Sequence, residues 1–157
     1  MAHTPTIAAD FDGCLCEHRF PECGAPITDV VALLRQLEEE GWLIVIHSCR
    51  ANSDWVGKGA SEQEARKKVD DMVEFLLEND VPFHSIWGIT MTSYADPFAW
   101  EYSGISGKPV ADVYLDDRAL HPVAALTAAD LHLACSRIVS QGGDPLAFHR
   151  SLGRSVD

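Results

Sequence analysis

Short apolar runs alternate along this chain with longer stretches in which apolar residues recur at helical spacing. The apolar runs predict strands over residues 6–10, 43–47, 83–89 and 113–116. Each of the first, second and last runs is followed directly by polar residues. We therefore expect chemistry-bearing side chains to gather where strands end.

Helical spacing follows the first two predicted strands. The apolar positions of the first predicted helix are Ile27, Val30, Val31, Leu34 and Leu37. Gly41 follows as its expected stop, and Ser61 with Glu64 forms a capping-box pattern that opens a second helix ending near Asn79. A last long helix is predicted over residues 126–139, before Gly142 and Gly143.

This alternation of strands and helices predicts an α/β fold. Parallel strands joined by right-handed helical crossovers give a Rossmann-like, three-layer α/β/α sandwich around a mostly parallel sheet. The 157 residues, 46% of them hydrophobic, suit one domain spanning residues 1–157 with a proper core.

Two carboxylates stand at the end of the first predicted strand. Asp10 and Asp12 are two residues apart, and Gly13 releases the backbone directly after them. A strand end allows such a pair to splay around a cation, at the sheet edge where open α/β sheets bind their ligands. The pattern indicates a metal-assisted site.

Three further features follow in order, each beside an apolar run. Ser48 follows the second run, Lys108 precedes the last run, and Asp116-Asp117 closes it. Together with the first carboxylate pair, these features resemble the haloacid dehalogenase-like (HAD) hydrolase superfamily over residues 7–118. The resemblance implies a HAD-like fold and a phosphatase-type member, because the second carboxylate of the motif is retained.

Each residue of this constellation has a role in phosphoryl transfer. Asp10 suits nucleophilic attack on phosphorus, which forms an aspartyl-phosphate, and Asp12 suits general acid and then general base catalysis. Ser48 and Lys108 suit binding of the phosphate oxygens. The expected activity is therefore Mg²⁺-dependent hydrolysis of a phosphomonoester.

The acidic residues also supply hard oxygen ligands of the kind that Mg²⁺ prefers. The expected metal ligands are Asp10, Asp12 (through its backbone carbonyl, by the resemblance), Asp116 and Asp117. Arg50 lies two residues after Ser48, where it suits either a phosphate clamp or a cap on the following helix.

The spacing between motifs leaves no room for a full cap domain. Only about a dozen residues separate Leu15 from the first predicted helix. Capless members have an open active site, so we expect either a larger substrate or a homo-oligomer that covers the site. The loop over residues 90–106, with Tyr94, Phe98, Trp100 and Tyr102, is the expected local cover, or else a patch whose rings pack against the domain or a second copy.

The formal net charge of −12 disfavours a nucleic-acid partner, so a small phosphorylated metabolite is the expected substrate. Neither a membrane-spanning run nor a leader sequence is visible, and the five cysteines suit a reducing compartment; we expect a cytoplasmic protein. Cys14, Cys16, Cys23 and His18 have a composition that suits zinc, but their spacing matches no usual zinc motif, and ordinary thiols are expected.

Three rival interpretations remain. A receiver domain also combines acids, a hydroxyl residue and a lysine, but there the lysine comes last, whereas Lys108 precedes the final acidic pair. A catalytically weak HAD-like binding or regulatory module is a second rival. A polynucleotide-end phosphatase or phosphotransferase is a third, and the negative charge makes it less attractive.

Overall fold

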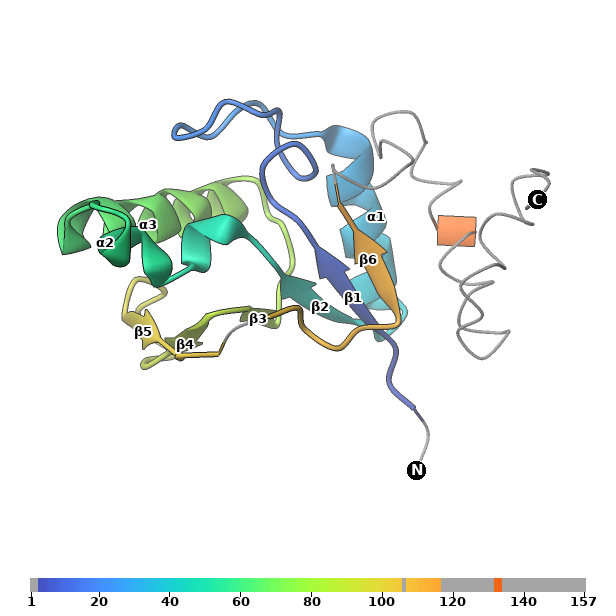
Figure 1. Cartoon of the computed structure of the whole chain (residues 1–157). Helices are drawn as coiled ribbons and strands as arrows, with labels where there is room; N and C mark the ends of the chain where they lie inside the picture. The colour runs from blue at the N-terminus through green and yellow to red at the C-terminus, as the bar shows by residue number, and fades with distance from the viewer. Residues whose placement is uncertain (1–2, 106, 117–131, 134–157) are drawn as a thin grey trace, which may run out of the picture.

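The computed structural model describes residues 3–105, 107–116 and 132–133 (Figure 1). Its centre is a four-stranded sheet in the order β3-β2-β1-β6, and every neighbouring pair is parallel. The strands are β1 (Thr6–Ala9), β2 (Leu43–Ile46), β3 (Ser85–Ile86) and β6 (Val113–Leu115). This is a mixed α/β fold with a mostly parallel sheet, as the sequence predicts, and it is compatible with a Rossmann-like fold.

Strand β1 lies at the centre of this sheet, between β2 and β6. Ile7, Ala8 and Ala9 are at most 2% exposed, because side chains on both faces of the strand are covered. Parallel sheets need cover on both faces, which is why their strands are continuous apolar runs. The chain passes from β1 to β2 through α1 (Thr28–Glu39), whose buried residues are Val30, Val31, Leu33, Leu34 and Leu37.

The predicted boundaries of the two helices agree with the structure. Gly41, at φ 86°, follows α1 in a conformation that favours glycine. Helix α3 (Glu62–Glu78) begins with the predicted capping box, in which the Ser61 hydroxyl accepts from the Glu64 amide and the Glu64 carboxylate accepts from the Ser61 amide. Asn79 is its C-cap.

Two short elements between β2 and α3 were not predicted. A 3-10 turn, η1 (Cys49–Ala51), follows β2 directly, and a single helical turn, α2 (Asp54–Gly57), comes next. Neither is long enough to show a periodic apolar pattern. Both lie beside the strand ends and matter for the site described below.

The single strand predicted over residues 83–89 is wrong. The structure divides this stretch between β3 of the parallel sheet and β4 (Ile89–Met91), which pairs with β5 (Trp100–Tyr102) in a separate antiparallel hairpin (Figure 1). Gly88 separates them at φ 100°, and a Cβ at this position would lie 2.7 Å from the Ala51 carbonyl oxygen. A side chain would not fit here, so glycine allows the chain to leave the sheet at this point.

Several predictions fall outside the described residues. They include Asp117, the tail beyond Gly142 and most of the helix over residues 126–139, of which only His132 and Leu133 are described. The single domain over residues 1–157 therefore stays a prediction. Across the described ranges, no helix has both the length and the apolar character needed to cross a membrane.

The capping box gives a first test. Ser61→Ala should lower the free energy of unfolding by about 1 kcal/mol, because the Glu64 amide loses its acceptor. The midpoint of urea denaturation measures this change. Ser53→Ala is the matched control, since Ser53 is the N-cap of α2 but its side chain makes no capping hydrogen bond. Equal losses in the two variants would contradict the assigned cap.

Candidate active site

The parallel strands end in a row of four residues. Asp116, Asp10, His47 and Trp87 each follow the last paired residue of β6, β1, β2 and β3. Backbone hydrogen bonds continue from strand to strand across this row. The amides of Asp10, His47 and Trp87 donate, each at 2.8 Å, to the last carbonyl oxygen of the neighbouring strand, on Leu115, Ala9 and Ile46 respectively. The expected gathering of polar residues at strand ends is confirmed for Asp10 and Asp116.

Asp10 and Asp116 lie at the point where the chain reverses its direction of travel across the sheet. From β1 the chain moves to β2 and β3 on one side, and it returns to place β6 on the other side. The boundary between β1 and β6 is thus a switch point in the strand order, where α/β sheets bind ligands at the carboxyl ends of their strands. A cavity of about 630 Å³ lies here, and all four residues of the row line it.

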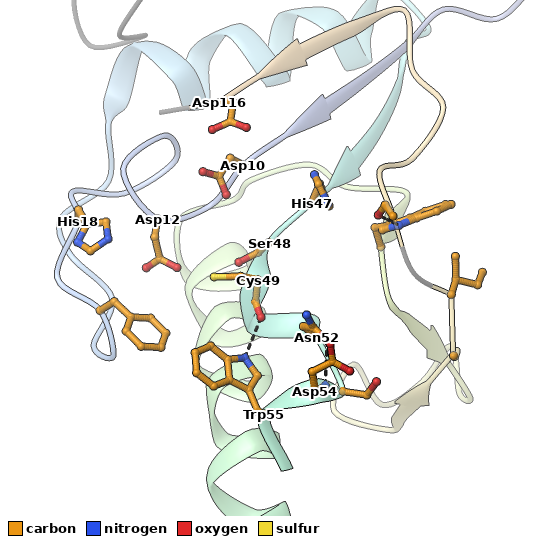
Figure 2. A pocket seen from close by; sticks show the side chains of 16 residues that line it. Asp10, Asp12, His18, His47, Ser48, Cys49, Asn52, Asp54, Trp55 and Asp116 are labelled. Carbon is orange, nitrogen blue, oxygen red and sulfur yellow. Dashed lines mark hydrogen bonds between the residues drawn. The ribbon is translucent and has the colours of Figure 1, made fainter. Parts of the chain in front are cut away.

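Asp10 is positioned by the backbone that follows it. Its Oδ1 accepts from the Phe11 amide at 2.8 Å, which fixes the carboxyl group at the end of β1. Figure 2 shows Asp116 and Asp10 next to each other, as expected for neighbouring parallel strands. Two hard carboxylate groups therefore share one wall of the cavity.

Asp12 is engaged by Arg50. Arg50 Nε donates to Asp12 Oδ2 at 2.8 Å, and Nη2 donates to Oδ1 at 2.7 Å. Arg50 is fully buried, and Asp12 is 7% exposed. Burial alone lowers the pKa of Arg50, but the hydrogen bonds and the charge of Asp12 outweigh it and raise the pKa above its usual value.

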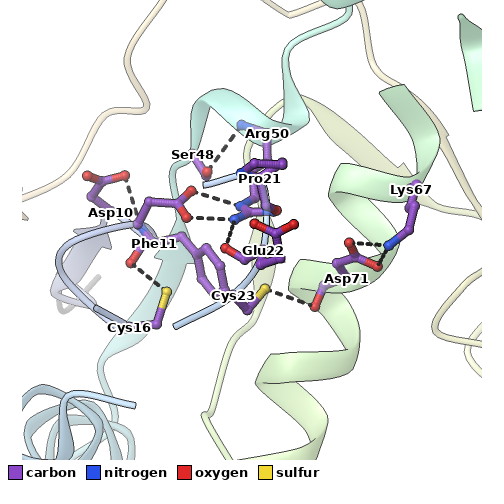
Figure 3. Close-up of polar contacts among 11 residues, drawn as sticks. Asp10, Phe11, Cys16, Pro21, Glu22, Cys23, Ser48, Arg50, Lys67 and Asp71 are labelled. Carbon is purple, nitrogen blue, oxygen red and sulfur yellow. Dashed lines mark hydrogen bonds and ion pairs between the residues drawn. The ribbon is translucent and has the colours of Figure 1, made fainter. Parts of the chain in front are cut away.

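The other donors of Arg50 point to a loop between β1 and α1. Nη1 donates to the Pro21 carbonyl oxygen at 2.8 Å, and Nη2 also donates to that of Glu22 at 3.0 Å (Figure 3). Arg50 therefore does not face the cavity as a phosphate clamp, nor does it cap the following helix. Its fixed fork of donors instead joins Asp12 to this loop.

Ser48 lies in the cavity wall, as the predicted phosphate-binding role requires. It is 6% exposed, and its Oγ accepts from the Arg50 amide at 3.2 Å, which caps η1. A hydroxyl group that accepts one hydrogen bond still has a proton to donate. Ser48 can therefore act as a donor toward a ligand oxygen.

Lys108 is not brought into the cavity. Its side chain is exposed, and Nζ lies 5.5 Å from the centre of the Tyr114 ring. Gly107 lines the cavity in its place. Lys108 acts on the site at a distance: burial lowers the pKa of His47, the positive charge of Lys108 lowers it further, and Asp116 opposes both.

The donor set can be compared with the needs of Mg²⁺. This ion is commonly held by one or two carboxylates, several waters and substrate oxygens, so the carboxylates of Asp10 and Asp116 fit it. Both oxygens of the Asp12 side chain accept from Arg50, and the ligand expected from Asp12 is its backbone carbonyl, which stays a prediction. No group of three or more His, Cys, Asp or Glu able to hold a metal occurs among the described residues, and Asp117 is not one of them.

The cysteines that suggested zinc are all described, and they are likewise not grouped with His18 as metal ligands. Cys16 Sγ donates to the Phe11 carbonyl oxygen, and Cys23 Sγ donates to that of Asp71. Burial raises the pKa of Cys16 to about 11, which keeps it a thiol at neutral pH.

The aromatic residues at the cavity are not those that the sequence suggested. Trp100 is buried, with the Arg66 guanidinium 4.2 Å from its ring centre, and its indole nitrogen donates to Asp70 on α3.

The four aromatic residues of the 90–106 loop do not line the cavity; Phe20, Trp55 and Trp87 do. Phe20 stacks on Trp55 with ring centres 5.7 Å apart. The 90–106 stretch reaches the cavity through Gly104 and Ile105 instead.

The sequence suggested His18 only as a possible zinc ligand, and it indicated no role at the site for Phe20, Trp55 or Trp87. His18 and Trp55 are among the residues around the cavity in Figure 2. For Trp87 the sequence offered Gly88 as a signal, because a glycine inside an apparent strand often marks the point where the strand is interrupted. For the others the signal lies in a loop and a four-residue helix, where periodicity carries no information.

Comparisons with known proteins show the fold alone. Neither a protein-family model nor a curated protein matches the chain. A solved structure of a conserved protein from Bacteroides thetaiotaomicron aligns with a TM-score of 0.58 and 22% identity, over 89% of this chain and 93% of that one. A target protein from Vibrio cholerae aligns with a TM-score of 0.47 and 21% identity, over 85% and 98%.

The buried ion pair gives a second test. Arg50→Met should lower the free energy of unfolding by about 3–5 kcal/mol, because it leaves the Asp12 carboxylate buried without its partner. Arg66→Met is the control: Arg66 also lies over an aromatic ring and donates to two backbone carbonyls, but its side chain is 46% exposed. Chemical denaturation compares the two, and equal losses would argue against a special role for the buried pair.

Proposed function

We propose that this protein is a Mg²⁺-dependent phosphomonoester hydrolase that works through an aspartyl-phosphate on Asp10. The observation that carries the proposal is the pair of carboxylates at the ends of β1 and β6, at the reversal point of the sheet and in the wall of a 630 Å³ cavity. The motif order that resembles HAD phosphatases supports the same function. In this proposal the fold is a HAD-like three-layer sandwich without a full cap domain.

Asp10 is the proposed nucleophile. One of its oxygens is held by the Phe11 amide, which orients the carboxyl group relative to the cavity. Attack on phosphorus forms an acyl-phosphate bond and releases the alcohol, and water then cleaves that bond to release phosphate. Ser48, on the neighbouring strand end, is the proposed donor to a phosphate oxygen.

Mg²⁺ would be held by Asp10 and Asp116, with Asp117 as a further ligand predicted from the sequence. When bound, it would offset the negative charge of the phosphate and of the two carboxylates, and so permit an anionic nucleophile to approach. The described lining residues include four aspartates (Asp10, Asp12, Asp54 and Asp116), which makes such compensation necessary.

Asp12 is the proposed acid and base, and its pairing with Arg50 limits how it can act. A carboxylate whose two oxygens both accept hydrogen bonds is an acceptor, which suits the activation of water. To donate a proton to the leaving alcohol, Asp12 must give up one bond to Arg50. The proposed mechanism therefore includes a loosening of this pair.

The same ion pair favours a second candidate function, a HAD-like binding or regulatory module that is catalytically weak. If the pair stays closed when a phosphorylated ligand binds, no proton reaches the leaving group, and the ligand is held without being turned over. The two candidates share the cavity and the cation but differ in turnover.

Phosphate release from a panel of small phosphorylated metabolites and an aryl phosphate tests the activity. We expect release with Mg²⁺, loss of release with EDTA, and loss of at least about 10³-fold in Asp10→Asn, because an amide is not a nucleophile toward phosphorus. Asp80→Asn is the control: Asp80 is exposed, lies outside the cavity lining and has φ 48°, a conformation that asparagine tolerates. Undiminished turnover in Asp10→Asn would contradict the proposed nucleophile.

Asp12→Asn separates the two candidate functions. Removal of a general acid or base should lower kcat about 10²-fold to 10⁴-fold, whereas a binding module has no turnover to lose. Thermal denaturation of the variant must accompany the assay, because Asp12 is also the partner of Arg50. A folded Asp12→Asn protein with unchanged kcat would remove Asp12 from the chemistry.

A further inference from the structure

Four side chains form a column beside the cavity. The Arg50 guanidinium lies 5.1 Å from the centre of the Phe20 ring, Phe20 stacks on Trp55 at 5.7 Å and 18°, and Lys68 Nζ lies 5.1 Å from the Trp55 ring. The four residues come from η1, the loop over residues 17–26, α2 and α3. A cation is attracted to the face of an aromatic ring, so the contacts within this column hold the four segments together.

The Arg50 guanidinium donates hydrogen bonds to two different parts of the chain. One side of the guanidinium binds both oxygens of Asp12, and the other side binds the carbonyl oxygens of Pro21 and Glu22 in the 17–26 loop. A buried guanidinium needs all of these acceptors, because an unsatisfied buried donor is costly. The loop and Asp12 are therefore bound by one rigid group.

The two ends of the 17–26 loop lie close to each other. The Glu17 amide donates to the Ala25 carbonyl oxygen at 2.8 Å. A Cβ on Gly24 would lie 2.2 Å from the Glu17 carbonyl oxygen, so only glycine allows the two arms to approach. His18 and Phe20 of this loop line the cavity.

We propose that Arg50 is a positioning residue, which couples docking of the 17–26 loop to the placement of Asp12 in the site. When the loop is docked, its two carbonyls and Phe20 hold the guanidinium, and the guanidinium holds Asp12. When the loop moves away, Arg50 loses those contacts, and Asp12 loses its fixed position. A ligand that contacts His18 or Phe20 thus controls the group proposed to activate water. The catalytic part of this inference rests on the proposed function, whereas the coupling itself does not.

The coupling is tested by hydrogen exchange of the Arg50 Nε–H, measured by NMR on the full chain. We expect slow exchange in the wild-type protein, since this group is buried and donates to Asp12. Phe20→Leu should speed the exchange by at least about threefold, because it removes the aromatic face that holds the cation. Arg66→Met, which removes a comparable cation–ring contact at Trp100, should leave the exchange of Arg50 unchanged.

Gly24→Ala tests the same coupling without touching the column. It forces the arms of the loop apart, so it should also speed the exchange of Arg50 Nε–H by at least about threefold. Gly57→Ala is its control, because a Cβ there meets nothing within 4 Å. Unchanged exchange in both Phe20→Leu and Gly24→Ala, in folded proteins, would overturn the coupling.

Kinetics of Gly24→Ala test the positioning role. The expected result is a fall in kcat of at least about threefold that is larger than any rise in KM, because Gly24 itself does not line the cavity and its substitution disturbs the loop that holds Arg50 and, through it, Asp12. A change confined to KM would overturn the positioning role. If the wild-type protein shows no turnover, the proposed function fails, and the exchange measurements still decide the coupling.

Discussion

The burial of the Arg50 guanidinium is the constraint on which the arrangement around the site depends. A cation that is 0% exposed must have its donors satisfied, and here Asp12 and two loop carbonyls satisfy them while the rings of Phe11 and Phe20 cover its faces. The chain after β1 turns at Gly13, which has φ 80°, and brings the carbonyl oxygens of Pro21 and Glu22 to Arg50. The two arms of this loop lie so close together that a Cβ on Gly24 would meet the Glu17 carbonyl oxygen. Arg50 thus holds both the Asp12 carboxylate and the loop that contributes His18 and Phe20 to the cavity lining.

The parallel sheet supplies the second half of the site. Because β1 lies between β2 and β6, its end is flanked by the ends of both neighbours, and Asp10 stands beside Asp116 on one side and His47 on the other. The carboxylates of Asp10 and Asp116 are neighbours because the hydrogen-bonded pairing of β1 with β6 places the two strand ends side by side. The sheet therefore holds the residues proposed to bind the metal and phosphate, and the Arg50 pair holds the residue proposed to move protons. Their meeting in one cavity is what makes phosphoryl transfer the best-supported proposal.

The elements that sequence reasoning predicted correctly are those with enough length to show a period. Strands β1, β2 and β6, helix α1 and the capping box of α3 are within one or two residues of their predicted bounds, because each is encoded by contiguous residues. The strand predicted over residues 83–89 was wrong because the chain leaves the sheet at Gly88, which has φ 100° and lies where a Cβ would meet the carbonyl oxygen of Ala51, a residue distant in sequence. The aromatic residues of the 90–106 stretch do not line the cavity, and Trp100 packs against Arg66 and Asp70 of α3. Ring chemistry alone does not specify which surface a ring covers.

The sequence by itself determined where β1, β2 and β6 lie along the chain and which acidic residues follow β1 and β6, because a strand and the residues that close it are local features. Only the tertiary structure decided which side chains contact one another at the site. Arg50 and Asp12 are 38 positions apart, and nothing in their local sequence distinguishes a phosphate clamp from a buried partner. The same holds for Phe20 and Trp55, whose stacking joins a loop to a single helical turn. Burial and charge pairing depend on segments that meet only in the folded chain, so the sequence could name the chemistry at the strand ends but not the side chain that positions it.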